Sequence, residues 1–316
     1  MSATTASLRR KIDAANDLQS VVRTMKALAS SNIGQYEKSV RALADYFHTV
    51  EFGLGACFRA NGPPTMFAGQ KRESAVAVIA AVVFGSDQGL VGRFNDVLAD
   101  FAVRTLAALP GKPRIWAVGE RVHARLIDAG LPLTGLFDVP NSIKSITPLI
   151  GRILMESEMS HRSSGLTHAD QGIVAELRLF YNRPSSGAAY KPVSQKLLPL
   201  DDAWRRSLVE RAWPSKNLPE VMEAGSATLR AYIREYLFVS LFRACAESLA
   251  SENASRLAAM QRADKNIAEM LSELTRSFHR LRQDSIDEEL FDVVSGFEAL
   301  MVKTQNSRKG GDTYAE

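Results

Sequence analysis

The sequence predicts an α+α/β protein in which a long antiparallel coiled coil of N- and C-terminal helices flanks a central Rossmann-like α/β domain. Three observations predict this fold. All twelve prolines lie between Pro63 and Pro219, so neither end of the chain contains one. Both ends carry apolar residues at three- and four-residue spacing, and the middle alternates strand-like with helix-like segments. Proline inside a helix costs about 3 kcal/mol, so proline-free ends favour long helices.

Residues 1–62 form the first predicted helix. Its apolar positions keep strict three- and four-residue spacing, which places them on one face of a helix. These positions are Ile33, Tyr36, Val40, Leu43, Phe47, Val50 and Leu54. A stripe of this kind needs a partner helix, because a long helix cannot bury it against a compact domain.

Residues 219–304 form the second long helix. Its stripe slips by one residue near Ser285, where the coiled coil should change its local winding. The stripe consists of Ile267, Leu271, Leu274, Phe278 and Leu281, then Ile286, Leu290, Val293, Phe297 and Leu300. The simplest way to bury both stripes is to pair the two helices within one chain. A bundle of shorter helices is the alternative. Residues 305–316 form a polar tail that we expect to be disordered.

Residues 63–218 form a predicted globular domain, which we call the foot. Ser74–Phe84 indicates a buried strand, and Phe94–Leu109 indicates a helix that ends at Pro110. Two further segments indicate strands, Arg114–Gly119 and Gly172–Asn182, and two indicate helices, Glu120–Gly130 and Ser142–Met159. Lys191–Leu200 indicates an extended crossing segment. Such alternation predicts a small, largely parallel sheet covered by helices.

Composition excludes several classes of protein. The net charge is +4 without a block of Lys or Arg, so no nucleic-acid partner is expected. Cys57 and Cys245 both stand in apolar helical contexts, which predicts buried, reduced thiols. No apolar run reaches the roughly 18 residues that cross a membrane. The five histidines have no metal-ligand spacing, and we expect no catalytic residue, no metal and no cofactor.

The segment Ser86–Asn95, "SDQGLVGRFN", raises the question of a nucleotide site, because it follows a buried strand and precedes a helix. We call this segment the foot turn. Its glycines match neither the dinucleotide pattern nor the ATP loop, and no Lys follows them. Asp87 would repel an anion unless it caps a helix. The residues therefore favour a structural turn.

The two ends and the foot turn together resemble the gamma subunit of F-type ATP synthases, the central rotor stalk. The opening helix has that family's Met-Lys pair at Met25 and Lys26, followed by a small-residue stretch. The foot turn resembles its S-D-x-G-L-x-G-x-F-N motif. The last helix resembles its A-x-R-x-x-A-M and R-Q-x-x-I motifs at Arg256 and at Arg282 with Gln283. The resemblance covers nearly the whole chain.

This resemblance implies a non-catalytic subunit that couples ion flow through a membrane sector to conformational cycling of the beta subunits. The implied partners are the alpha and beta subunits, the epsilon subunit and the membrane rotor ring, with one copy of the chain per complex. The implied location is peripheral, on the cytoplasmic face of a bacterial inner membrane.

The resemblance also implies three groups of functional residues. A polar catch against the beta subunits comprises Met25, Lys26, Arg256, Arg282 and Gln283. An apolar bearing tip comprises Val293, Val294, Phe297, Leu300 and Met301. The family positions of the foot turn are Ser86, Asp87, Gly89, Gly92 and Asn95.

Some positions depart from the family pattern. Asn32 stands where a basic residue is common, and Phe297 and Glu298 replace small residues. These departures suggest a divergent branch, such as the alternate, sodium-associated synthases. The residues alone leave two other classes open: a nucleotide-dependent α/β enzyme with coiled-coil arms, and a coiled-coil scaffold or tethering protein.

Overall fold

The computed structural model describes residues 4–61, 78–162, 174–185, 190–217, 219–221 and 226–309. They divide into two compact units. Unit 1 combines Met1–Met25 with Met260–Glu316, and unit 2 is Lys26–Ala259. Two long helices, α1 (Thr5–Asn61) and α6 (Ser226–Lys309), each contribute residues to both units.

Unit 2 contains a five-stranded sheet in the order β3-β2-β1-β4-β5. The first four strands pair in parallel, and β4 and β5 form an antiparallel pair at one end. The strands are β1 (Val78–Phe84), β2 (Lys112–Val118), β3 (Leu133–Phe137), β4 (Val174–Pro184) and β5 (Tyr190–Leu198). The prediction of a largely parallel sheet is confirmed.

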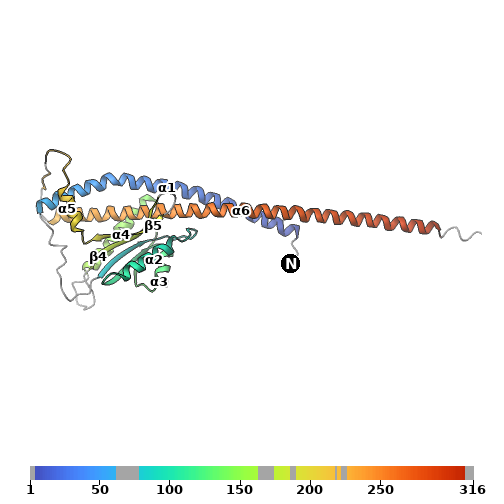
Figure 1. Cartoon of the computed structure of the whole chain (residues 1–316), viewed down its shortest axis with the longest axis horizontal. Helices are drawn as coiled ribbons and strands as arrows, with labels where there is room; N and C mark the ends of the chain where they lie inside the picture. Colours follow the sequence, from blue (N-terminus) through green and yellow to red (C-terminus); the bar gives the residue numbers. More distant parts are fainter. Residues whose placement is uncertain are drawn as a thin grey trace, which may run out of the picture. The chain divides into compact units, whose positions relative to one another are not determined.

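Both faces of the sheet are covered, which explains why the central strand β1 is a continuous apolar run. Alternate residues of β1 point to opposite faces: Ile79 packs with α2 (Phe94–Ala107) and α3 (Glu120–Asp128), whereas Val82 packs with α4 (Ile143–Arg162) and α6. The figure shows α2 and α3 together, apart from α6 (Figure 1). The long helix α6 is therefore one wall of the foot's hydrophobic core.

A third core cluster joins the two long helices at the far end of unit 2. Leu54 and Phe58 of α1 pack there with Ile233 of α6 and with Leu208 of α5 (Asp202–Glu210). Cys57 belongs to this cluster. It and Cys245 are both buried and unbonded, as the sequence predicted.

The two long helices run antiparallel within each unit. In unit 2, Asn32 Nδ2 lies 3.4 Å from Asn253 Oδ1, and the Tyr46 hydroxyl donates to Glu235 at 2.6 Å. In unit 1, Gln19 Nε2 lies 3.4 Å from Asp264 Oδ1. Because residue numbers fall along α6 as they rise along α1, the predicted antiparallel pair is confirmed.

Two elements were not expected from the sequence. The edge strand β3 is only five residues long and contains a glycine, so it gave no strand-like run. Helix α5 has nine residues and is capped by Asp201, whose side chain accepts a hydrogen bond from the Ala203 amide. The beginning of the predicted strand Ser74–Phe84 lies outside the described residues.

Candidate functional site

The foot turn is closed by hydrogen bonds between its own ends. The Ser86 amide donates to Asn95 Oδ1 at 3.0 Å, and Asn95 Nδ2 donates back to Ser86 Oγ at 2.8 Å. The Ser86 hydroxyl in turn donates to the Gln88 carbonyl at 3.0 Å. Ser86 and Asn95 are both buried, and these hydrogen bonds give their side-chain polar atoms partners within the turn.

Asp87 caps a helix, although not the helix that follows its own turn. One carboxylate oxygen accepts from the Glu120 amide at 3.0 Å, at the start of α3. The other accepts from the Val139 amide at 2.8 Å. An aspartate at a helix N-terminus satisfies an otherwise unpaired N–H and interacts favourably with the helix dipole. The Asp87 carboxylate therefore ties three segments of the foot together.

Two positions of the loop after β1 require glycine. Gly92 has φ of +57°, a left-handed conformation that side chains disfavour. A Cβ atom at Gly85 would lie 2.3 Å from Val122, which is too close for any side chain. Gly89 has only Arg121 nearby, at 3.8 Å. Leu90 is the exception, because it holds φ of +62° with a side chain that is 60% exposed.

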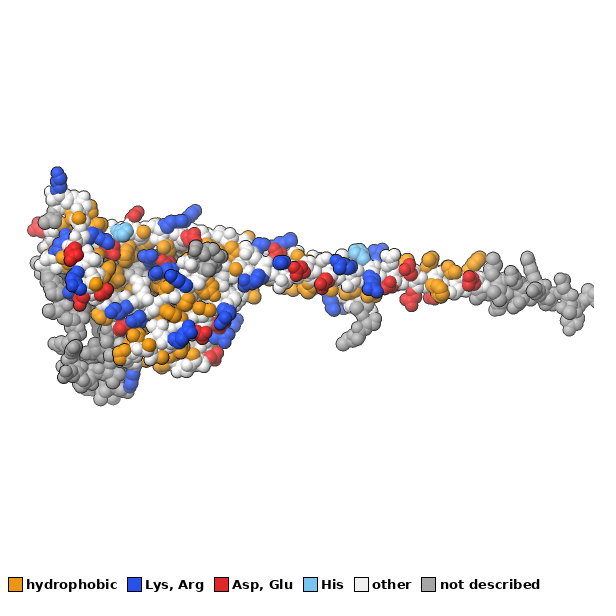
Figure 2. All heavy atoms as spheres, in the orientation of Figure 1, with side chains coloured by type: hydrophobic (Ala, Val, Ile, Leu, Met, Phe, Trp, Pro, Cys, Tyr) orange, Lys and Arg blue, Asp and Glu red, His pale blue; other side chains and the backbone are white. Residues whose placement is uncertain are grey.

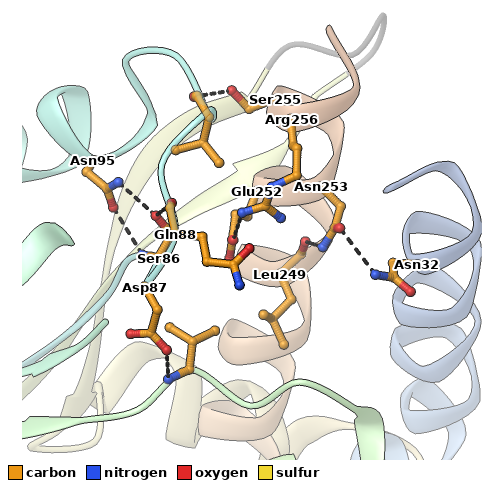
Figure 3. Close-up of polar contacts among 12 residues, drawn as sticks. Asn32, Ser86, Asp87, Gln88, Asn95, Leu249, Glu252, Asn253, Ser255 and Arg256 are labelled. Atoms are coloured by element: carbon orange, nitrogen blue, oxygen red, sulfur yellow. Dashed lines mark hydrogen bonds and ion pairs between the residues drawn. The ribbon is translucent and has the colours of Figure 1, made fainter. Parts of the chain in front are cut away.

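Helix α6 holds both sides of this loop through two serines. Ser248 Oγ donates to the carbonyl of Phe84 at 2.9 Å, and Ser255 Oγ donates to the carbonyl of Val91 at 2.5 Å. The two serines stand seven residues apart, which places them two turns apart on one face of α6. We call the contact between this face and the foot turn the junction (Figure 3).

A buried ion pair lies between the two serines. Glu252 accepts from Arg256 Nη2 at 2.6 Å, and their side chains are only 6% and 14% exposed. Gln88 extends from the foot turn toward this pair (Figure 3). The second carboxylate oxygen of Glu252 is buried without a partner among the described residues. Burial, reinforced by the negative charge of Asp87, raises the pKa of Glu252, while Arg256 opposes the shift.

The proposed catch residues belong to different units. Arg256 belongs to the junction in unit 2, whereas Arg282 and Gln283 are exposed on α6 in unit 1. Met25 and Lys26 are half-buried on α1.

The end of α6 in unit 1 is an exposed helix with an apolar surface. Every residue from 282 to 298 is exposed. Phe291 is 72% exposed and Val293 70%. The other large apolar residues are Ile286, Leu290, Val294 and Phe297. Figure 2 shows hydrophobic side chains gathered along this end. Leu300 and Met301 lie in α6, but their side chains are outside the described ones.

Comparison with known proteins identifies the family of this chain. The family model described as ATP synthase matches residues 4–300. The chain belongs to the ATP synthase gamma family. It is 27% identical over 297 residues to the ATP synthase gamma chain of Moorella thermoacetica, covering 93% of this chain and 98% of that one. It is 28% identical over 308 residues to the gamma chain of Rhizobium johnstonii, with the same coverage.

Solved structures share the fold. A chain of the Euglena gracilis mitochondrial ATP synthase, from the OSCP/F1/c-ring structure in rotational state 3, superposes with a TM-score of 0.60 at 17% identity. The match covers 99% of this chain and 98% of that one. A chain from the rotor of the same synthase in rotational state 1 gives a TM-score of 0.57 at 14% identity, covering 89% and 98%.

Family membership decides between the three classes that the residues left open. The chain is the central rotary stalk of an ATP synthase and a non-catalytic subunit of it, attached to the enzyme's membrane sector. Among the described residues, no helix is long and apolar enough to cross a membrane. The same residues contain no group of three or more His, Cys, Asp or Glu arranged to hold a metal ion.

The sequence reasoning missed the α6 side of the junction. Ser248, Glu252 and Ser255 stand at helical spacing on a face that is apolar one to two turns earlier, at Leu241 and Ala244. A signal was present, because the segment Glu247–Arg256, "ESLASENASR", interrupts the apolar stripe with small polar residues. Such an interruption on a buried helix face indicates hydrogen bonds to a neighbouring backbone.

Proposed function

We propose that this chain turns as a single shaft inside a ring of alternating alpha and beta subunits, with the exposed end of α6 among them. The exposed apolar surface of residues 286–297 carries this proposal. A helix that displays so many apolar side chains in unit 1 requires a surrounding surface. One shaft contacts three beta subunits differently, so its rotation shifts each of them between conformations in turn.

Within this proposal, Val293, Val294 and Phe297 form the bearing tip, together with Leu300 and Met301. Apolar contacts are non-directional, so they hold the shaft on its axis without favouring one angle. Directional bonds at the tip would instead have to break at each step.

The catch residues have a different task, which is to register angle. Arg282 and Gln283 are exposed and available to acidic groups on beta subunits. Met25 and Lys26 support the catch from α1. Arg256 joins it only if it exchanges Glu252 for a carboxylate of a beta subunit.

The foot has its own proposed partners, the epsilon subunit and the membrane rotor ring, on the cytoplasmic face of a bacterial inner membrane. Each complex contains one copy of the chain. Exposed basic residues such as Arg206 and Lys216 would favour acidic partners or lipid headgroups. Arg211 is less available, because its guanidinium pairs with Glu51 at 2.9 Å.

The catch is tested by changing Arg282 and Gln283 to Ala in the assembled complex. The chain should fold and assemble, because both side chains are exposed, but ATP-driven torque and coupled ATP turnover should fall. Lys265→Ala with Glu269→Ala is the matched control, since these residues are 78% and 65% exposed elsewhere on α6 in unit 1. Unchanged torque in the Arg282 and Gln283 variant would remove both residues from the catch.

The shaft itself is tested by isolating the chain from its native cells. Alpha and beta subunits should accompany it in a three-three-one ratio. Recovery as a homodimer would support the scaffold class, and calorimetric binding of ATP or NAD by the isolated chain would support the enzyme class.

A further inference from the structure

A groove runs between α1 and α6 in unit 2, on a surface that the proposed bearing and catch do not use. It consists of two adjoining cavities of about 390 and 170 Å³, both lined by Val40 and Arg41. The α1 wall extends from Glu37 to Phe47, and the α6 wall from Val239 to Ala250. Each wall is therefore about 15 Å long, or three helical turns.

The smaller cavity has an apolar floor. Leu43 and Phe47 come from α1 and Val239 comes from α6. Val239 is fully buried beneath the groove, while Val40, Leu43 and Phe47 are only partly buried. This floor offers apolar area to a further side chain, which a small inorganic anion would not use.

Two arginines are fixed at the groove by one buried carboxylate. Arg183 Nε donates to Glu247 Oε2 at 3.0 Å, and Arg243 Nε donates to Glu247 Oε1 at 2.8 Å. Arg183 also donates to the hydroxyl of the buried Tyr181 at 2.5 Å. The Glu247 side chain is 8% exposed, whereas the arginines are 41% and 49% exposed. Both guanidinium groups are thus held in place with N–H groups left for another acceptor.

Arg41 adds a third positive charge on the α1 side and lines both cavities. Among the described residues Arg41 forms no ion pair, although Glu37 lines the larger cavity one turn before it on α1. Glu37 and Glu247 are the carboxylates of the groove, so the arginines exceed them by one, and Glu247 is already shared between two arginines. The rim of the groove is therefore cationic and preorganised beside an apolar floor.

We propose that this groove binds an amphipathic helix with acidic residues along one side, supplied by another subunit of the same ATP synthase. A helix of three turns fits the length of the walls, its apolar side meets the floor, and its carboxylates meet the arginines. The inference rests on the proposed function only in that the chain works inside a multisubunit assembly.

The test is a photo-cross-link from within the groove. Ala44 lines the smaller cavity and is exposed, so Ala44→benzoylphenylalanine places the probe there without removing an arginine. In the purified, assembled synthase, the cross-link should map to a segment with acidic residues at helical spacing beside apolar ones. No cross-link, or one to a basic or extended segment, would overturn the proposal.

The cross-linked segment is then made as a free peptide and titrated against the full chain. Arg41→Ala with Arg243→Ala should weaken binding at least tenfold, or about 1.4 kcal/mol, because the peptide loses charged hydrogen bonds to two guanidinium groups. Arg104→Ala with Arg121→Ala, an equal charge change at exposed positions of α2 and α3, is the control. Equal weakening by both pairs would show attraction to net charge alone and contradict the groove. Failure to recover alpha and beta subunits would instead contradict the proposed shaft.

Discussion

Two stretches of the same helix show opposite relations between side-chain character and burial. At the junction, α6 buries Ser248, Glu252 and Ser255 against the foot turn. At its end in unit 1, it exposes Phe291 and Val293. Burial on a long helix is thus set by what lies beside it rather than by its own hydropathy. Ser248 and Ser255 at the junction bond a neighbouring backbone, Glu252 pairs with Arg256, and the apolar residues at the end require a surface from outside the described chain.

Replacing a phenylalanine by alanine should give the largest difference between the core beneath the junction and the exposed end of α6. Phe84→Ala should lower the free energy of unfolding by about 3–5 kcal/mol, because the side chain is 2% exposed in the core beneath the junction. Phe297→Ala removes a side chain that is 61% exposed, so it should change that free energy by less than about 0.5 kcal/mol. Urea denaturation of the full chain measures both. A large loss of stability for the Phe297 variant would mean that the end of α6 is covered within the chain.

Replacing an arginine should likewise lower stability at the junction but not at the exposed end of α6. Arg256→Ala should cost roughly 3 kcal/mol, because it leaves the buried carboxylate of Glu252 without its countercharge. Arg282→Ala, at an exposed position, should leave stability unchanged. Adding Glu252→Gln to Arg256→Ala removes the uncompensated charge and should restore much of the loss. A stability loss that the second substitution does not relieve would show that Arg256 acts through packing.

The serines of the junction allow a finer comparison. Ser248→Ala and Ser255→Ala should each cost about 1 kcal/mol, because each removes a buried hydrogen bond from α6 to a carbonyl of the loop. Ser251→Ala is the matched control. Ser251 lies between them on α6 and is equally buried, but its hydroxyl has no partner among the described residues. Hydrogen exchange at the foot turn should rise in the two serine variants and stay unchanged in the control.

The smallest expected effect is the pH dependence of the junction. Burial raises the pKa of Glu252 in the folded chain above its ordinary 4.5, with Asp87, Tyr36, Cys245 and Arg256 as the titratable or charged groups around it. An acid with a raised pKa stabilises the fold below 4.5, and this contribution is lost as pH rises through the folded pKa. Glu252→Gln should therefore become more stable relative to the native chain as pH rises from 4.5, by about 1.4 kcal/mol for each pH unit until the folded pKa is reached. A difference that does not change with pH would mean that Glu252 is not shifted.

Much of the fold could be predicted from the sequence. Proline-free ends and three-four spacing indicated α1 and α6 and their antiparallel pairing, because helix periodicity is a strong local signal. The continuous apolar run of β1 indicated a strand covered on both faces. The glycine spacing distinguished the foot turn from the known nucleotide loops, and the order of a strand, a turn and a helix was expected.

The contacts of the foot turn could not be predicted in the same way. Asp87 caps α3, which begins 33 residues later, and Ser255 bonds a carbonyl 164 residues away. These bonds depend on which elements the fold brings together, and no local pattern contains that information. The edge strand β3 was missed for a related reason, since its pairing with β2 stabilises a segment of weak intrinsic preference.

Other expectations stay predictions. The division at residues 62, 218 and 304, the divergent branch, and the residues of the catch and the bearing tip are not decided by the fold. The catch is open to direct test, because Arg282 and Gln283 can be changed without disturbing a buried contact.

The central claim, that this chain is a turning shaft, is tested most directly by watching it turn. Cys57 and Cys245 are buried, so Asp100→Cys on the exposed side of α2 gives one reactive thiol for a bead. With the alpha and beta subunits fixed to a surface, ATP should drive the bead in one direction in discrete steps. Steady ATP hydrolysis by the same complexes with a bead that only fluctuates would contradict the account.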